Sequence, residues 1–515
     1  MKRFLILMLR VAKVVAALVA LLLLAGLLMI GWIKWSSARD WQRVQSGLKA
    51  KGEKLTFAEL IPPPPPDSEN FFADPIWRGL TDLVPTKQLG ICGEYTDWEP
   101  RLPANKRLIN QWQTPLSASE KEHIQKLLPK ETPKEIDEMG RAVVIRELGW
   151  EIRKSTDPER RKKIASLLLT LLQPAEPLLA KITELSKRPL AAFPIRWEDG
   201  AAAPLPQIAA LLSLGQVFSA RSRTELELGN SPAASADALT LLRLSSVEKY
   251  DPLLIAHLVR LAILQQALSV INSGIERNQW TDAELADFQK PLESTDLVVD
   301  FVFVLRGERA FFNYCTEHKP TRIDRINNTW DNLKYTFLTN CLWESYAIIQ
   351  SANANYIQHA VELIPQERPR GLNATTSVFR DSRGDTEKNP LLLLWYQAIQ
   401  ANGARAMNTS VKKTIEAQTQ VSQTLIACAL ERYRLAHGSY PASLDLLVPE
   451  SLGTIPKEPT TGRPMQYRLL SAGKFLLWSP GWKLRTLDGK PGEFSGEGDI
   501  VWNLPLPREE RKSSP

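Results

Sequence analysis

Every position from Val14 to Ile33 is apolar, and no charged residue interrupts this stretch of 20 residues. A helix rises about 1.5 Å per residue, so the stretch reaches roughly 30 Å, the thickness of the hydrocarbon core of a bilayer. Trp32 and Trp35 stand at its far end, and indole rings favour the membrane interface. The pattern predicts that residues 1–35 form a cytoplasmic tail and a transmembrane anchor.

A cleaved signal peptide is the alternative interpretation of this region. Ser36-Ser37-Ala38 resembles a cleavage site with small residues. A signal peptide has an apolar core of about 7–15 residues, and the longer stretch found here favours an uncleaved anchor. The positive-inside rule leaves the orientation open, because basic residues lie on both sides of the stretch: Lys2, Arg3, Arg10 and Lys13 before it, and Lys34, Arg39, Arg43, Lys49, Lys51 and Lys54 after it.

The segment between the anchor and the body, residues 36–115, combines three patterns. A juxtamembrane helix is expected first, and the run Pro62–Pro66 ends it. Consecutive prolines favour an extended polyproline helix, which acts as a stiff spacer. The remainder lacks clear periodicity and is predicted to be an irregular strap, held on the body by the aromatic residues Phe71, Phe72, Trp77 and Trp98.

Residues 116–405 carry apolar positions at helical spacing and many helix start signals. Three of these signals are capping boxes, in which a hydroxyl and an acid satisfy backbone N–H groups at the helix start: Ser117 with Glu120, Thr132 with Glu135, and Thr281 with Glu284. Helices joined by short polar turns pack as antiparallel hairpins. The prediction is a mostly α protein whose body is irregular, with hairpin or solenoid-like packing.

Residues 406–515 differ from the body. A long helix ending near His437 precedes a region rich in Gly and Pro, which contains the short runs Met465–Leu469, Phe475–Trp478 and Asp499–Trp502. Turn residues between short aromatic and branched runs are typical of a small sheet. The sequence predicts a compact α+β module at this end.

Composition narrows the functional classes. The 515 residues are 44% hydrophobic and 23% charged, as in globular proteins. The net charge is +7, but the five basic residues among the first 35 have no acid beside them and supply +5 of it. The remaining +2 gives no clustered surplus of positive charge for binding nucleic acid.

The spacing of the four cysteines predicts no metal-binding pair: they are Cys92, Cys315, Cys341 and Cys428. If the body is exported, Cys315 and Cys341 are the best candidates for a disulfide.

The C-terminal module resembles the globular domain of the major pseudopilin of type II secretion systems. The resemblance covers about 75 residues and rests on an ordered set of matches: residues 430–435, His437-Gly438-Ser439-Tyr440-Pro441, Leu447-Val448-Pro449-Glu450, Ile455-Pro456-Lys457-Glu458-Pro459, Gly462-Arg463-Pro464, Tyr467, Leu477-Trp478-Ser479 and Asp499-Ile500-Val501-Trp502. The pseudopilin processing site is missing from residues 1–13, so we interpret the module as a borrowed domain.

The whole chain also resembles a class of uncharacterised bacterial membrane-anchored helical proteins with this ending, on residues 67–75 and 306–310. These resemblances imply a single-pass protein of the bacterial inner membrane, with the body on the periplasmic side. They also imply a calcium site in the C-terminal loop, since pseudopilins of this type hold calcium there. Calcium needs about 6–8 oxygen ligands, and Asp488 and Asp499 are the candidates, with Glu493 and Glu497 nearby. Trp482 stands where an oxygen ligand is expected, and this depleted ligand set favours a polar surface loop without calcium.

Arg306-Gly307-Glu308-Arg309 is the most unusual helical stretch, because Glu308 falls on an apolar face. A carboxylate removed from water needs a partner. We expect a structural ion pair between Glu308 and Arg306, Arg309 or an arginine of another helix, with a carboxylate tuned for acid–base chemistry as the alternative.

Three functions remain open. The preferred one is a membrane-anchored, envelope-facing, non-enzymatic protein that acts through protein contacts, because the chain contains no Gly-x-Ser-x-Gly, His-Glu-x-x-His, phosphate-loop or nucleotide-binding motif. The others are an accessory component of a secretion or pilus-like machine and an envelope hydrolase. A pocket with two or more convergent side chains of shifted pKa would favour the hydrolase.

Overall fold

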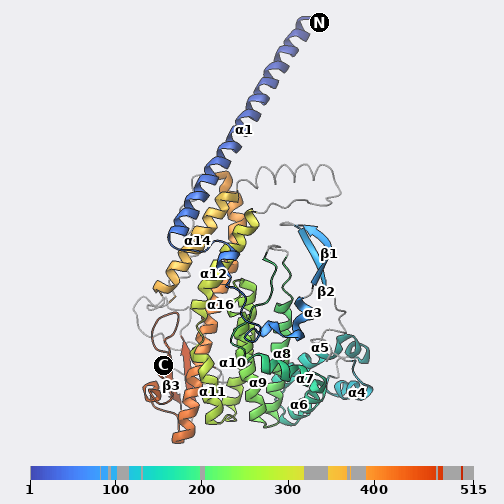
Figure 1. Ribbon diagram of the computed structural model, residues 1–515, viewed down its shortest axis with the longest axis vertical. Coiled ribbons are helices and arrows are strands. Elements are labelled where there is room, and N and C mark those ends of the chain that lie inside the picture. The colour runs from blue at the N-terminus through green and yellow to red at the C-terminus, as the bar shows by residue number, and fades with distance from the viewer. Residues whose placement is uncertain are drawn as a thin grey trace.

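The structure is a computed structural model. It describes residues 2–81, 83–90, 94–100, 115–128, 132–197, 203–317, 346–367, 372, 390–470, 474–479 and 500–502. These residues form a mostly helical body from which one long helix projects (Figure 1). The prediction of a mostly α protein is therefore confirmed.

The projecting helix is α1, Lys2–Ala50. Most of the described apolar side chains of the predicted span are exposed, as Leu22 and Leu27 show with 69% and 67% of their surface exposed. This helix is long and apolar enough to span a membrane. It continues past Trp35 without a break, so the predicted boundary at residue 35 falls inside a single helix.

The body is built from helices that the structure bounds as α4 Ala118–Leu127, α5 Pro133–Lys154, α6 Pro158–Leu172, α7 Glu176–Leu185, α8 Pro206–Glu227, α9 Ser231–Val247, α10 Leu254–Glu276, α11 Asp282–Glu293, α12 Leu297–Glu317, α14 Tyr346–Glu367 and α16 Pro390–His437. The three predicted capping boxes form at the starts of α4, α5 and α11. Helices α8, α9 and α10 pack against one another at the centre of the main core. Although α10 is also apolar enough to span a membrane, its Ile263, Ala267 and Val270 are fully buried, as expected of a core helix.

The segment after α1 lies along the body and includes α2 Phe57–Leu60, two 3-10 turns, η1 Phe71–Ala73 and η2 Pro75–Trp77, and α3 Arg78–Thr81. Phe71, Phe72 and Trp77 pack together in the main core, and the Trp77 Nε1–H donates to the Phe71 carbonyl at 2.9 Å. The aromatic residues thus attach this strap to the body. The side chain of Trp98 lies outside the described residues.

The prediction that residues 67–115 are irregular was wrong in one part. Strands β1 Leu83–Gly90 and β2 Glu94–Pro100 pair antiparallel there, with a shift of register after Pro85. Tyr95, Thr96 and Trp98 favour strands, but Pro85 interrupts the first strand and the expected alternation, so the sequence pattern concealed the hairpin.

The C-terminal module continues directly from α16, which runs through the predicted domain boundary at residue 406. Strand β3 Gln466–Leu470 pairs antiparallel with β4 Lys474–Ser479, and β4 pairs with β5 Ile500–Val501. The two-stranded part of the predicted sheet is confirmed. Side chains of the module share the main core with the helical body, and the Trp502 Nε1–H donates to Asn272 of α10 at 3.0 Å. The module is therefore packed against the body as part of one core.

Candidate functional site

The Arg-Gly-Glu-Arg stretch lies in the middle of α12, beside the point where the chain leaves α1. Gly52 ends α1 with a φ of 76°, in the left-handed region that favours glycine. The Glu53 N–H then donates back to the Leu48 carbonyl at 3.0 Å. This turn directs the Glu53 side chain toward α12, and we call Glu53 with residues 306–309 the junction.

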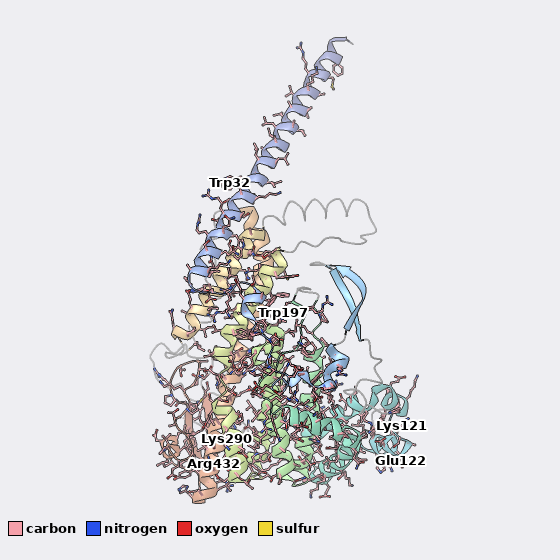
Figure 2. All side chains as sticks on the ribbon, in the orientation of Figure 1. Trp32, Lys121, Glu122, Trp197, Lys290 and Arg432 are labelled. Carbon is pink, nitrogen blue, oxygen red and sulfur yellow. The ribbon has the colours of Figure 1, made fainter. Side chains whose placement is uncertain are left out.

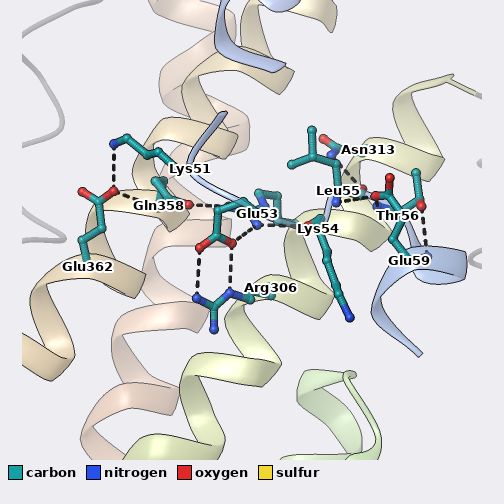
Figure 3. A network of polar contacts seen from close by, with 11 residues as sticks. Lys51, Glu53, Lys54, Leu55, Thr56, Glu59, Arg306, Asn313, Gln358 and Glu362 are labelled. Atoms are coloured by element: carbon teal, nitrogen blue, oxygen red, sulfur yellow. Dashed lines mark hydrogen bonds and ion pairs between the residues drawn. The ribbon is translucent and has the colours of Figure 1, made fainter. Parts of the chain in front are cut away.

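Two arginines of α12 converge on the Glu53 carboxylate, and Figure 3 shows the contact made by Arg306. Arg306 binds it through two nitrogens, with Nε–Oε2 and Nη2–Oε1 distances of 2.9 Å, while Arg309 Nη2 lies 2.6 Å from Oε2. Arginines three positions apart lie on one face of a helix, which lets both reach one partner. Arg309 is fully buried and Glu53 is 8% exposed, so this ion pair is largely removed from water.

The electrostatic balance keeps Glu53 charged. Burial alone would raise its pKa, but the hydrogen bonds and charges of Arg306 and Arg309 outweigh burial and lower the pKa to about 2. Burial lowers the pKa of Arg309, and the Glu53 carboxylate opposes that shift. Two guanidinium groups around one buried carboxylate form a structural contact that leaves no free acid or base for chemistry.

Further contacts extend the junction to α14. Arg309 Nη1 donates to Gln358 Oε1 at 2.6 Å, and Lys51 Nζ binds Glu362 Oε1 at 2.8 Å (Figure 3). Leu48 of α1 is buried in a small apolar cluster with Ala354 of α14. The end of the anchor helix is therefore held on the body by both apolar packing and ion pairs.

The expected pairing of Glu308 with an arginine was wrong. Its Oε1 accepts the Leu254 N–H at 2.8 Å, so Glu308 caps the first turn of α10. Burial raises the pKa of Glu308, the Leu254 N–H opposes the shift, and the Asp251 charge adds to it. The physical reason is the direction of the side chain: Glu308 points to α10, whereas Arg306 and Arg309 point to Glu53.

Gly307 makes this arrangement possible. A Cβ at this position would collide with the backbone carbonyl oxygen of Pro252. Glycine therefore allows α12 to approach the start of α10 closely enough for Glu308 to reach the Leu254 N–H.

An apolar cavity of about 310 Å³ adjoins the start of α10. Its walls come from the proline run and from residues 190–197, and they include the aromatic rings of Phe72, Phe193 and Trp197. Glu248 and Asp251 also line it. Burial, followed by the charge and hydrogen bond of Asp251, raises the pKa of Glu248, and burial raises that of Asp251 to about 6. Burial and the neighbouring carboxyl thus both favour the protonated form of Glu248.

The cavity is poor in other polar groups. Asp251 Oδ1 already accepts the Leu253 N–H at 2.9 Å. Among the described residues that line it, no Lys, Arg, His, Ser or Cys side chain is present. The carboxyl pair therefore stands in an apolar wall without a nucleophile or a cation beside it.

The sequence-predicted metal candidates Asp488 and Asp499 lie outside the described residues, as does Cys341, the proposed partner of Cys315. Within the described part of the chain, no group of three or more His, Cys, Asp or Glu side chains could hold a metal ion. Sequence reasoning missed Glu53 and Glu248. Only the fold brings Glu53 to its arginines, whereas Glu248 stands three positions before Asp251 and the fold supplies its burial.

No protein-family model, curated protein or solved structure matches this chain.

Proposed function

We propose that this protein is a membrane-anchored, non-enzymatic module that holds its helical body in a fixed orientation and acts through protein contacts on the periplasmic face of a bacterial inner membrane. The observation that carries this proposal is the junction. An anchor that served only as a tether would need no buried ion pair at its end, whereas a helix that fixes orientation does.

The length of α1 supports the same proposal. The helix continues beyond the apolar stretch, from Ile33 to Ala50, and this extension is roughly 25 Å long. Trp32, labelled in Figure 2, marks the end of the apolar stretch. Because Glu53 follows directly, no flexible linker separates this extension from the body. Trp41, Val44 and Leu48 of this extension pack with Ala354 of α14, so the extension lies along the body and fixes its position relative to the apolar stretch.

Protein contacts are proposed at the C-terminal module. Four large apolar side chains of this module are exposed: Leu435, Leu446, Val448 and Leu469. Large exposed apolar side chains can contact another protein, and a surface on which they form one patch is typical of an interaction site. The pseudopilin resemblance lies in the same module. It supports a narrower form of this proposal, the secretion form, in which the protein is an accessory component of a secretion or pilus-like machine.

The contact proposal is tested by photo-crosslinking in intact cells. A photoreactive amino acid at Leu446 or Leu469 should yield discrete cross-linked species, and the same amino acid at exposed Glu122 on α4 should not. Retrieval of pilins in these species would support the secretion form. Identical patterns from all three positions, or none at Leu446 and Leu469, would contradict a contact surface on the module.

Membrane side is tested separately. A single cysteine near Pro66 should react in intact spheroplasts with a thiol reagent that cannot cross membranes. Reaction only after lysis would place the body in the cytoplasm and reverse the proposed orientation. The protein should resist extraction by carbonate and high salt and dissolve in detergent; a soluble form beginning at Arg39 would restore the signal-peptide interpretation.

The hydrolase alternative is favoured by one observation, the carboxyl pair in the apolar cavity. Two carboxyls that share a proton can activate a water molecule. If this function holds, Glu248→Gln and Asp251→Asn should each abolish turnover of ester, amide or glycoside substrates by the purified protein. If the wild type turns over none of these substrates but still cross-links at Leu446, the hydrolase function is contradicted and the contact proposal is supported.

A further inference from the structure

A second cavity, of about 220 Å³, lies where α10 ends, at the opposite end of that helix from the junction. Four arginines line it: Arg153 from the end of α5, Arg161 from the first turns of α6, Arg223 from α8 and Arg277 after α10. The acids in its lining are Glu227 and Glu276. The lining therefore carries a surplus of two positive charges.

Two of these arginines form ion pairs with the same carboxylate. Glu227, which is 6% exposed, accepts from Arg161 Nε at 3.1 Å and from Arg277 Nη2 at 2.5 Å. Arg161 Nη1 also donates to the Ser155 carbonyl at the end of α5. These arginines have structural roles, since they satisfy a buried carboxylate and a helix C-terminus.

Arg223 has no such partner. Its Nη2 and Nη1 donate to the hydroxyls of Ser269 and Ser273 at 2.6 and 3.3 Å. No carboxylate of the described residues forms an ion pair with it. Burial, followed by the charges of Arg153 and Arg277, lowers its pKa to about 10, and the charges of Glu276 and Glu227 oppose that shift. This half-buried guanidinium donates to neutral hydroxyls and lacks the direct carboxylate contact that arginines removed from water normally have.

Arg221, two positions earlier on the same helix, has the carboxylate partners that an arginine removed from water usually has. It binds Asp237 through two nitrogens at 2.8 and 2.6 Å and also reaches Glu176 at 2.7 Å. Burial opposes the charged form, but these carboxylates outweigh it and raise the pKa of Arg221. The same helix thus carries one neutralised arginine and one that is not.

We propose that the cavity at the end of α10 binds a phosphoryl group, with Arg223 as the principal contact and the Ser269 and Ser273 hydroxyls orienting its guanidinium. A phosphoryl group carries about −1.5 to −2 charge at pH 7, which matches the surplus of the lining. The planar fork of arginine fits phosphate oxygens through two parallel hydrogen bonds. The cavity is smaller than the roughly 300–1,000 Å³ of pockets for drug-sized ligands, so it suits the phosphoryl end of a molecule.

The position of the cavity indicates a soluble ligand. Helix α10 begins at the junction, where Leu254 meets Glu308, and its 23 residues span about 34 Å. It runs toward the end of the body opposite the anchor helix (Figure 1). The headgroups of the bilayer that holds α1 therefore lie far from the cavity. This site is independent of the proposed contact function, since it shares no residue with the junction or with the exposed side chains of the C-terminal module.

The test uses the full-length protein in nanodiscs, purified without phosphate, and follows melting temperature and calorimetric binding at constant ionic strength. Inorganic phosphate and glycerol phosphate should each raise the melting temperature, and chloride and acetate should not. Nanodiscs of anionic lipid should give no shift relative to zwitterionic ones, which separates a soluble ligand from a headgroup.

Arg223→Gln should weaken phosphate binding by about tenfold or more, because hydrogen bonds to charged groups are the strong ones. It should also raise the melting temperature of the ligand-free protein, since it removes an uncompensated charge. Arg221→Gln is the matched control: it should lower that melting temperature and keep the phosphate-dependent shift. Arg223→Lys, which retains the charge and loses the fork, should bind phosphate more weakly than the wild type.

Two results would overturn the proposal. The first is an equal shift with phosphate and chloride, which would mean general screening of charge. The second concerns a folded Arg223→Gln protein. If it is less stable than the wild type in the absence of ligand and responds to phosphate as the wild type does, Arg223 is a structural residue.

Discussion

The two ends of α10 carry arginine clusters that differ in whether the arginines directly contact a carboxylate. At the junction, Arg306 and Arg309 surround the buried carboxylate of Glu53. At the other end, Arg223 donates to two hydroxyls and forms no ion pair with a carboxylate of the described residues. The unusual sequence motif marks the closed, structural cluster, whereas the open cluster stands in an ordinary stretch of α8. An arginine's role is therefore set by whether the fold supplies it with a counter-charge.

The largest expected effect comes from removing that counter-charge at the junction. Glu53→Ala leaves Arg309 buried without a carboxylate and should cost about 3–5 kcal/mol in the free energy of unfolding. Chemical denaturation in nanodiscs measures it. The control is Asp40→Ala, which removes an exposed ion pair with Arg43 on the same helix and should change stability by about 0.5 kcal/mol or less. Equal effects of the two variants would remove the distinction between the clusters.

Acid should weaken the junction in a defined pH range. The pKa of Glu53 is lowered to about 2 in the folded protein, against about 4.3 when unfolded. Its contribution of about 3 kcal/mol is complete above about pH 5 and is lost as the pH falls toward 2, because the unfolded state then binds the proton first. Denaturation at several pH values checks this. Glu53→Gln should flatten that part of the profile; an unchanged profile would show that Glu53 is not the group responsible.

Gly307→Ala tests the close approach that lets α12 serve both Glu53 and α10. The added Cβ meets the Pro252 backbone, and overpacking of this kind costs about 1–3 kcal/mol. Gly149→Ala on α5 is the matched control, since its Cβ would make an ordinary contact with Ala220 and alanine favours a helix. A neutral Gly307→Ala, measured by thermal melting, would mean that the two helices are farther apart than described.

The smallest expected effect concerns Glu308. Glu308→Ala removes the acceptor of the Leu254 N–H and should cost about 1–2 kcal/mol, as loss of a helix cap does. Glu308→Gln keeps an acceptor without a buried charge and should lie within about 0.5 kcal/mol of the wild type. Melting temperatures of both variants decide it. If Glu308→Ala lowers the stability as much as Glu53→Ala does, Glu308 is an ion-pair partner of an arginine rather than a helix cap.

Local patterns predicted the parts of this molecule that depend on neighbouring residues. The apolar stretch Val14–Ile33, the three capping boxes and strands β3 and β4 follow from composition and spacing within a few residues. The partner of Arg306 could not be predicted in this way, because Glu53 is 253 positions away in the chain. Likewise, only the packing of α8 on α10 brings Arg223 beside Arg277. The apolar cavity forms only because the fold joins the proline run with residues 190–197 and 247–252.

The central claim, that the junction fixes the body on the anchor helix, is tested most directly by pulsed electron spin resonance in nanodiscs. Spin labels would replace exposed Arg39 on α1 and exposed Lys290 on α11, with the native cysteines removed. The wild type should give one narrow distance distribution, Asp40→Ala should leave it unchanged, and Glu53→Ala should broaden it. A broad distribution in the wild type, or an identical narrow one in all three proteins, would contradict the claim.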